Sequence, residues 1–216
     1  MASDLFGGAH ILGVILAGGA ARRMGGGDKG LRPFAGDTLL GHVIQRFGPQ
    51  VHRLILNANG DPARLERFGL PIVADHDGKS LGPLAGLLAA MDYAGRTPPP
   101  PIGAFTHIAA VSTDVPYLPL DLIERLAAAA GSGAAIAVSD GRRHPTIGLW
   151  PLSLKASLMH AIAHGELSAN AFAAHHGAIE VTFPFSETDG MLVDPFFNVN
   201  TPQDLEIARR LAARPL

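Results

Sequence analysis

The chain of 216 residues contains no cysteine. Disulfide bonds, catalysis by a thiolate and zinc sites with cysteine ligands are therefore excluded, although this absence leaves the cellular compartment open. A large excess of either charge is also missing, because 17 basic residues stand against 19 acidic ones. This balance of charges argues against a protein that binds nucleic acid over its whole surface. Any phosphate binding is therefore expected at a local site.

Long apolar runs are missing as well. No apolar segment reaches the roughly 20 residues that a membrane-spanning helix needs. The N-terminal stretch carries Asp4 and no early Lys or Arg, and its apolar run continues into a glycine-rich loop. We interpret it as a strand and not as a signal peptide. We expect a cytoplasmic protein whose partners include neither a membrane nor nucleic acid.

Segments typical of strands and of helices alternate along the chain. The strand-like segments are residues 10–17, 53–58, 70–75, 106–112, 134–140, 144–151 and 179–185. Helical spacing of apolar residues occurs at 38–48, 82–95, 119–131, 153–165, 168–177 and 201–213, with Gly48 and Gly95 as expected helix ends. This rhythm predicts an α/β fold with a mostly parallel central sheet and helices on both faces. Ligands of such sheets bind at the carboxyl ends of the strands.

The stretch VILAGGAARRMGGGDKG, residues 14–30, places glycines and cations directly after the first buried strand. Glycine lets backbone N–H groups approach phosphate oxygens closely, and Arg and Lys neutralise phosphate charge. The spacing matches neither the dinucleotide pattern G-x-G-x-x-G nor the Walker pattern. A flexible surface loop with solvated arginines is the alternative. We interpret the stretch as a polyphosphate site.

Six motifs together carry a resemblance to a known family. They are LAGGAARRMGGGDKG at 16–30, LILNAN at 54–59, ADHDGKSLGPLAG at 74–86, STDVPYLP at 112–119, HPTIGLW at 144–150 and FFNVNTPQDL at 196–205. The first motif resembles the wider class of Rossmann-like nucleotidyltransferases. The combination resembles the molybdenum cofactor guanylyltransferases, and it extends along most of the chain.

The resemblance implies a fold and an activity. The fold is the three-layer Rossmann-like nucleotidyltransferase fold, in one domain over residues 1–216. Nucleotide binding is expected in residues 10–115, binding of the pterin substrate in 116–200, and a C-terminal helix in 201–216. The implied reaction transfers GMP from GTP to the terminal phosphate of molybdopterin (Mo-molybdopterin), with Mg²⁺ as cofactor and pyrophosphate as the second product. Cofactor-insertion and delivery proteins are implied as further partners.

The same resemblance implies three catalytic residues. Lys29 and Arg23 are expected to contact the triphosphate of GTP. Asp114 is expected to hold Mg²⁺, because it follows the apolar strand at 106–112 and a hard carboxylate suits that ion. A turn-forming Asp before Pro116 is the alternative, and turn formation is compatible with metal binding.

Further residues are implied as contacts to the substrates. Near the nucleotide these are Leu16, Ala17, Gly18, Gly19, Asn57, Asp75, Asn198 and Asn200. Asn57 and Asp75 each end an apolar strand and offer acceptors for guanine. A turn Asn and a helix-capping Asp are their alternatives. The alternation in Asn-Val-Asn places Asn198 and Asn200 on one side of an extended segment, which by the resemblance lines the cleft near the metal or the pterin phosphate. The alternative is that Asn200 only helps to start the final helix.

The pterin side is less well marked. His144 matches a family motif there, although a lone His is more often structural. Family members often carry basic residues after the Gly-Glu near residue 166, where this chain has Leu167, Ser168 and Asn170. A basic contact to the pterin substrate is therefore missing here or supplied from elsewhere.

Three other functions remain open. Two belong to the same class of enzymes, namely a molybdopterin cytidylyltransferase and a sugar-phosphate nucleotidyltransferase. The LAGG start favours the guanylyl branch over the LAAG form that is common among cytidylyl relatives. The third is a nucleotide-binding carrier of the cofactor, which would need the glycine loop but not the metal-binding acid.

Overall fold

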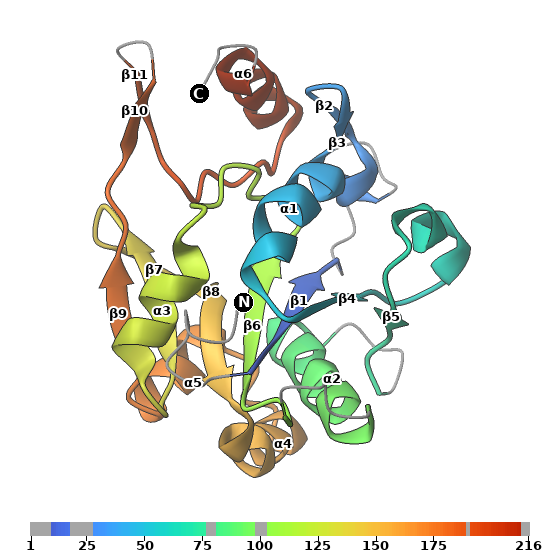
Figure 1. The fold of residues 1–216 in the computed structure, drawn as a ribbon, viewed down its shortest axis with the longest axis vertical. Coiled ribbons are helices and arrows are strands. Elements are labelled where there is room, and N and C mark those ends of the chain that lie inside the picture. Colours follow the sequence, from blue (N-terminus) through green and yellow to red (C-terminus); the bar gives the residue numbers. More distant parts are fainter. Residues whose placement is uncertain (1–9, 18–27, 77–80, 98–102, 189–190, 213–216) are drawn as a thin grey trace.

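One sheet of seven strands organises the chain (Figure 1). The computed structural model describes residues 10–17, 28–76, 81–97, 103–188 and 191–212. The sheet has the order β5-β4-β1-β6-β8-β7-β9, and β8 runs antiparallel to both of its neighbours while the other pairs are parallel. The strands are β1 (Ile11–Leu16), β4 (Arg53–Asn57), β5 (Ile72–Val73), β6 (His107–Ser112), β7 (Ala135–Ser139), β8 (Arg142–Pro151) and β9 (Ile179–Thr182). The predicted mostly parallel sheet is confirmed.

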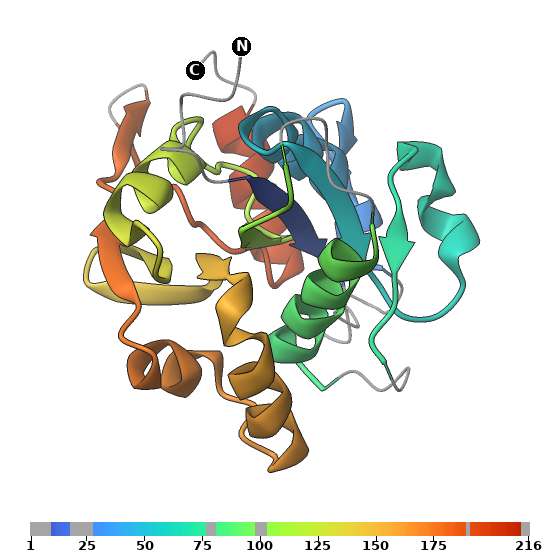
Figure 2. The ribbon, with the colours of Figure 1, turned by 60° about the horizontal axis from the view of Figure 1, so that its bottom comes forward.

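Helices cover both faces of this sheet, as Figures 1 and 2 show. The helices are α1 (Leu39–Phe47), α2 (Pro83–Arg96), α3 (Leu122–Ala130), α4 (Lys155–Ala163), α5 (Ala169–His175) and α6 (Pro202–Ala212). Helices α1 and α3 share one apolar core with Ile11 and Ile15 of β1, whereas α2, α4 and α5 share another with Leu12 and Val14. Because successive strand residues point to opposite faces, one apolar strand supplies both cores. The predicted three-layer arrangement is confirmed.

Short elements connect the layers. Four 3₁₀ helices and two small hairpins lie within the described residues: η2 (Lys29–Leu31), η3 (Gly48–Gln50), η4 (Pro62–Phe68), η5 (Leu152–Leu154), β2 (Pro33–Phe34) with β3 (Asp37–Thr38), and β10 (Ser186–Thr188) with β11 (Met191–Val193). The 3₁₀ helix η4 is capped by Asp61 and begins with Pro62, a position that favours proline. The hairpins were not predicted, because strands of two or three residues carry no readable periodicity.

Of the two expected helix ends, Gly48 is confirmed and Gly95 is wrong. The hydroxyl of Thr201 accepts a hydrogen bond from the N–H of Asp204 and so caps α6, and Gly48 ends α1. The expected stop of α2 at Gly95 is wrong, because the helix continues to Arg96 and ends where the N–H and hydroxyl of Thr97 donate to the carbonyl of Tyr93. No helix in the described part of the chain is long and apolar enough to cross a membrane.

The carboxyl ends of the three central parallel strands meet at one edge of the sheet. Leu16, the last residue of β1, pairs with Asn57 at the end of β4 on one side and with Ser112 at the end of β6 on the other. The residues that follow these strands are therefore brought together although they are far apart in sequence. The candidate active site lies at this edge.

Candidate active site

The ammonium group of Lys29 lies at the centre of the site. Its Nζ is 2.6 Å from Oδ2 of Asp114, donates to Oδ1 of Asn200 at 2.6 Å, and donates to Oδ1 of Asn198 at 3.4 Å. We call these three acceptors the oxygen cluster (Asp114, Asn198 and Asn200). Lys29 starts η2, whose first turn is capped because Oδ1 of Asp28 accepts from the N–H of Gly30. Three segments that are far apart in the sequence therefore converge on one cation.

Local hydrogen bonds hold the oxygen cluster in place. Oδ1 of Asp114 accepts from the hydroxyl of Ser112 at 2.7 Å, and the carbonyl of Asp114 accepts from the N–H of Val199 at 2.9 Å. Oδ2 of Asp204 accepts from the N–H groups of Asn200 and Thr201. Burial alone would raise the pKa of Asp204, but these hydrogen bonds and the charge of Lys29 hold it below its ordinary value. The last helix thus anchors the segment that carries both Asn side chains.

A second cluster of polar side chains follows β4 and β5. The amide of Asn57 donates to Oδ1 of Asp75 at 2.9 Å and to the carbonyl of Val73 at 3.1 Å. The amide of Asn59 donates to Oδ2 of Asp75 at 2.8 Å, and its own oxygen accepts from the N–H of Asp75. Each carboxylate oxygen of Asp75 keeps a further lone pair, so the group is oriented and still able to accept. Asp75 also lines a cavity of about 310 Å³ that includes His76 and Tyr93.

The start of α2 passes very close to these side chains. A Cβ added to Gly86 would lie 2.3 Å from Oδ1 of Asn57 and 2.7 Å from Cδ2 of Leu16. No side chain fits at such a distance. The last glycine of the Gly-Pro-Leu-Ala-Gly motif therefore lets the helix pack against the ends of β1 and β4.

A cavity of about 590 Å³ opens beside the oxygen cluster. It is lined by Gly141, Arg142, Arg143, His144, Pro145, Thr146, Asn170 and Asn198. Asn198 lines this cavity and is also a member of the oxygen cluster, so the cavity borders the cluster. Nε2 of His144 lies 2.9 Å from the hydroxyl of Ser139, and burial lowers the pKa of His144 despite the nearby charge of Asp194. His144 is therefore a neutral, mostly buried ring in the wall of this cavity.

Comparison with known proteins assigns this chain to a family. Residues 13–179 match the MobA-like NTP transferase domain. The chain belongs to the MobA-like NTP transferase family. Proteins named molybdenum cofactor guanylyltransferase from Mesorhizobium japonicum and Bradyrhizobium sp. are 45% and 46% identical to it over 205 residues. The match covers 93% of this chain in both cases, and 95% and 92% of those proteins. The family predicted from the sequence motifs is confirmed.

Solved structures support the fold of the family. A molybdopterin-guanine dinucleotide biosynthesis protein A from Archaeoglobus fulgidus is 21% identical, with a TM-score of 0.67 over 94% of this chain and 98% of that one. A Mycobacterium tuberculosis protein solved in complex with manganese is 19% identical, with a TM-score of 0.64 over 94% of this chain and 99% of that one. At such identities the likeness concerns the fold alone, which is that of nucleotidyltransferases.

The structure brings most of the predicted residues of this family member to one sheet edge. Lys29, Asp114, Asn198 and Asn200 form one cluster, while Asn57 and Asp75 form the other. Leu16 and Ala17 lie between them, and the N–H of Ala17 donates to the carbonyl of Asn57 at 2.8 Å. Gly18, Gly19 and Arg23 lie outside the described residues, and their roles stay predictions.

Three residues of the site were missed in the sequence. Asn59 stands two residues after Asn57, the spacing that places side chains on one side of an extended segment, and this signal could have found it. Ser112 precedes Asp114 by the same spacing. Arg64 lies on η4, and its side chain contacts Asp28 and the backbone of Asn59. Nothing in the local pattern of the sequence marks Arg64.

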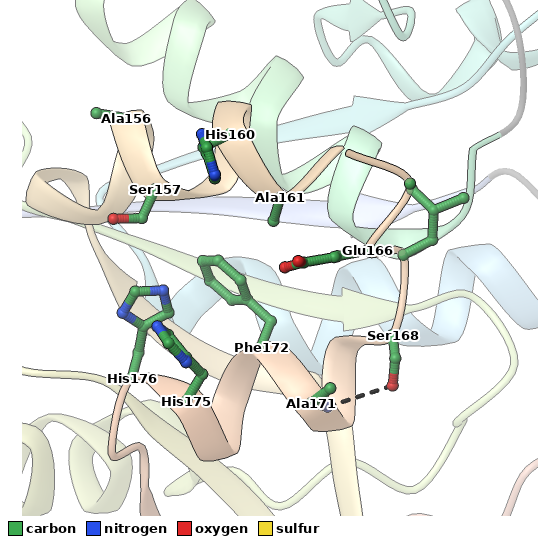
Figure 3. Close-up of a pocket in the computed structure, with 12 residues that line it drawn as sticks. Ala156, Ser157, His160, Ala161, Glu166, Ser168, Ala171, Phe172, His175 and His176 are labelled. Carbon is green, nitrogen blue, oxygen red and sulfur yellow. Dashed lines mark hydrogen bonds between the residues drawn. The ribbon is translucent and has the colours of Figure 1, made fainter. Parts of the chain in front are cut away.

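A further cavity lies elsewhere, between α4 and α5 (Figure 3). It has a volume of about 800 Å³, and the side chains of His160, His175, His176 and Glu166 surround it with Phe172. None of the residues of the two clusters lines it. No group of three or more His, Asp or Glu in the described part of the chain could hold a metal ion. His160 is exposed on α4.

Proposed function

We propose that this chain transfers GMP from GTP to the terminal phosphate of molybdopterin, with the two clusters at the sheet edge as its nucleotide site. The observation that carries this proposal is the convergence of Lys29 with the oxygen cluster, beside the oriented carboxylate of Asp75. The relatives named molybdenum cofactor guanylyltransferase span nearly the whole chain and support the same reaction. Residue roles, metal identity and the pterin subsite are the parts that we add.

Asp75 is the guanine acceptor in this proposal. Guanine presents N1–H and N2–H₂ donors, which a carboxylate with two free lone pairs accepts. Asn57 and Asn59 hold that carboxylate in one orientation through their amides. Because Asp75 is mostly buried, its hydrogen bonds to a base are stronger than they would be in water. Asn57 thus acts mainly through Asp75 and through the close packing against Gly86.

Lys29 contacts the phosphates in this proposal. An ammonium group with three donors suits phosphate oxygens. In the structure these donors point to the oxygen cluster at the carboxyl end of the sheet, so Lys29 would exchange some of these acceptors for phosphate oxygens when GTP binds. Backbone groups of Leu16, Ala17, Gly18 and Gly19 are further contacts to the phosphates in this proposal. Arg23 adds a second positive charge to the triphosphate.

The oxygen cluster also suits a hard divalent cation. It contains one carboxylate and two amide oxygens, and it already surrounds a positive charge, that of Lys29. Mg²⁺ prefers oxygen ligands and takes one or two carboxylates while it keeps several waters. Asp114 would hold the ion, with Asn198 and Asn200 beside it. When bound, Mg²⁺ would neutralise negative charge on the phosphates.

The chain's own residues position and stabilise the reaction. An oxygen of the terminal phosphate of molybdopterin forms a bond to the α-phosphorus of GTP, and the bond from that phosphorus to the pyrophosphate oxygen breaks. Negative charge on the phosphoryl oxygens needs fixed positive partners, which here are Lys29 and Arg23. Asp75 fixes the base and so sets where the α-phosphorus lies.

The cavity of about 590 Å³ is the proposed pterin subsite. It borders the oxygen cluster through Asn198, and Asn170 also lines it. Arg142 and Arg143 line it and supply the positive charge that family members often carry after Gly-Glu near residue 166. The basic contact that the sequence lacks at Leu167 and Ser168 is thus supplied from β8.

A product assay tests this function. Purified chain is incubated with molybdopterin, Mg²⁺ and each nucleoside triphosphate, and pyrophosphate release and product mass are measured. Among the nucleoside triphosphates, only GTP should give pyrophosphate and a guanine dinucleotide. This reaction should require molybdopterin. Faster turnover of CTP, or nucleotide binding without any release of pyrophosphate, would contradict the proposal. Protein partners, the division of the domain into two substrate-binding parts and a cytoplasmic location stay predictions.

A further inference from the structure

The guanidinium group of Arg64 bridges the two clusters of the nucleotide site. Its Nε donates to Oδ2 of Asp28 at 3.1 Å, and its Nη2 donates to the carbonyl of Asn59 at 2.8 Å. Its Nη1 donates to the carbonyl of Asp61, within the same turn. One planar group therefore makes directed contacts with the segment that precedes Lys29 and with the segment that follows Asn57.

Each end of this bridge adjoins a proposed substrate contact, by sequence on one side and by hydrogen bonds on the other. On one side, Asp28 caps the 3₁₀ turn that begins with Lys29, because its other oxygen accepts from the N–H of Gly30 at 3.0 Å. On the other side, Asn59 exchanges two hydrogen bonds with Asp75, through its amide and to its oxygen. A continuous path thus runs from Lys29 through Arg64 to Asp75.

The bridge is partly shielded from water. The side chain of Arg64 is 29% exposed and that of Asp28 is 12% exposed, so this ion pair is screened less than one on the open surface. The planar guanidinium has five donors in a fixed fork, and a lysine at this position could reach only one partner with the same geometry. Arg67 of the same 3₁₀ helix is 57% exposed and pairs with Asp37, away from both clusters.

We propose that Arg64 is a positioning residue that couples recognition of guanine at Asp75 to the placement of Lys29 on the phosphates. The inference rests on the proposed function, which assigns the base and the phosphates to these two clusters. A base that orders the Asp75 segment also orders Asn59, then Arg64, and then the turn that carries Lys29. The phosphates therefore bind to the Lys29 turn when it is already ordered, and the base and the triphosphate of GTP bind cooperatively.

Fragments of GTP separate this coupling from a structural role. Calorimetric titrations in the presence of Mg²⁺ compare GTP, guanosine and inorganic triphosphate on the wild type, Arg64→Ala, Arg64→Lys and the control Arg67→Ala. Arg64→Ala should weaken GTP binding by about tenfold or more, a loss larger than the product of its losses for guanosine and for triphosphate. Arg64→Lys should recover a small part of the loss, and Arg67→Ala should leave all three affinities unchanged.

A second substitution keeps the test decisive if Arg64→Ala is poorly folded. Asp28→Asn removes the other end of the ion pair, and it should reduce GTP binding as Arg64→Ala does, with no further loss in the double variant. A loss for GTP that equals the product of the losses for the two fragments would overturn the coupling. So would a lowered melting temperature with unchanged affinities.

The same titrations test the assignment on which the inference rests. Asp75→Asn should weaken guanosine and GTP but leave inorganic triphosphate unchanged. If Asp75→Asn leaves guanosine binding unchanged, the base does not lie at Asp75, and the proposed base site and the coupling fall together. If Asp75→Asn behaves as expected and Arg64→Ala shows no excess loss for GTP, only the coupling is wrong.

Discussion

Nζ of Lys29 lies 2.6 Å from Oδ2 of Asp114, although the two residues are 85 positions apart in the chain. The side chains are 12% and 16% exposed, so a largely buried positive charge and a largely buried negative charge compensate each other. Removing either one leaves the other without its partner. The pair therefore holds together the turn after the glycine loop and the end of β6 before any substrate binds.

Substitution of Lys29 tests its contact with the phosphates. Lys29→Ala should lower kcat/KM for GTP by on the order of 10²- to 10³-fold, because a fixed positive charge is lost where negative charge develops. Lys155→Ala is the matched control, since Lys155 is a partly exposed lysine of α4 that pairs with Asp92 and not with the oxygen cluster. Steady-state kinetics of pyrophosphate release measure both variants. Equal activities of the two variants would contradict the role of Lys29.

Substitution of Asp114 tests the metal assignment. Asp114→Asn keeps the size of the side chain but removes its charge, and we expect a rate lower by on the order of 10²-fold with a higher requirement for Mg²⁺. Asp121→Asn, an exposed position on the N-terminal side of α3, serves as the control. The measurement is the rate as a function of Mg²⁺ concentration. An unchanged rate would remove Asp114 from the mechanism.

Two glycines of α2 give a matched pair of substitutions. Gly86→Ala places a methyl group 2.3 Å from Oδ1 of Asn57, so it should raise KM for GTP by disturbing the Asn57–Asp75 pair. Gly95→Ala meets nothing within 4 Å in the same helix and should stabilise the protein by roughly 0.5–1 kcal/mol without changing KM. Kinetics and urea unfolding measure the two effects. A normal KM in Gly86→Ala would show that the base pocket tolerates the shift.

Much of this architecture was readable from the sequence, for identifiable physical reasons. Asn57 ends an apolar strand, and Asp75 and Asp114 follow closely after two others, so the three residues come to the carboxyl edge of a parallel sheet. The alternation of Asn198 and Asn200 places both on one side of an extended segment. The predicted end of α2 at Gly95 was wrong. An exposed glycine in the last turn is tolerated there, because the hydroxyl of Thr97 caps the helix.

The bridge through Arg64 could not be predicted in this way. An arginine on a short 3₁₀ helix has no periodic signal, and its partners Asp28 and Asn59 are set by the path of the chain around the sheet edge. The same holds for the two arginines of β8 in the proposed pterin subsite. Long, flexible side chains reach partners that local patterns do not indicate.

Buried histidines make the stability of the fold depend on pH. Burial lowers the pKa of His144 below its ordinary value of 6.5, and it also lowers the pKa of His52, His107 and His176. As the pH falls below that value the unfolded chain takes up protons before the folded chain does. Their contribution is therefore fully present above about pH 6.5 and is lost as the pH falls toward the lower folded-state values.

The variant His144→Gln isolates one part of this effect. In urea unfolding, the wild type should lose free energy of unfolding between about pH 7.5 and about pH 5.5, and His144→Gln should lose less over the same range. The carboxylates with lowered pKa values, Asp92 and Asp204, titrate below this window and do not obscure the result. The same loss in both proteins would show that His144 takes no part.

Selective binding of GTP tests the central claim most directly. Calorimetric titration of the purified chain with GTP, CTP, ATP and UTP, each with and without Mg²⁺, measures whether the edge formed by Asp75, Lys29 and Asp114 reads guanine together with a metal-bound triphosphate. The account predicts tight binding of GTP that requires Mg²⁺ and much weaker binding of the other three nucleotides. Tighter binding of CTP, or equal binding of all four, would contradict it.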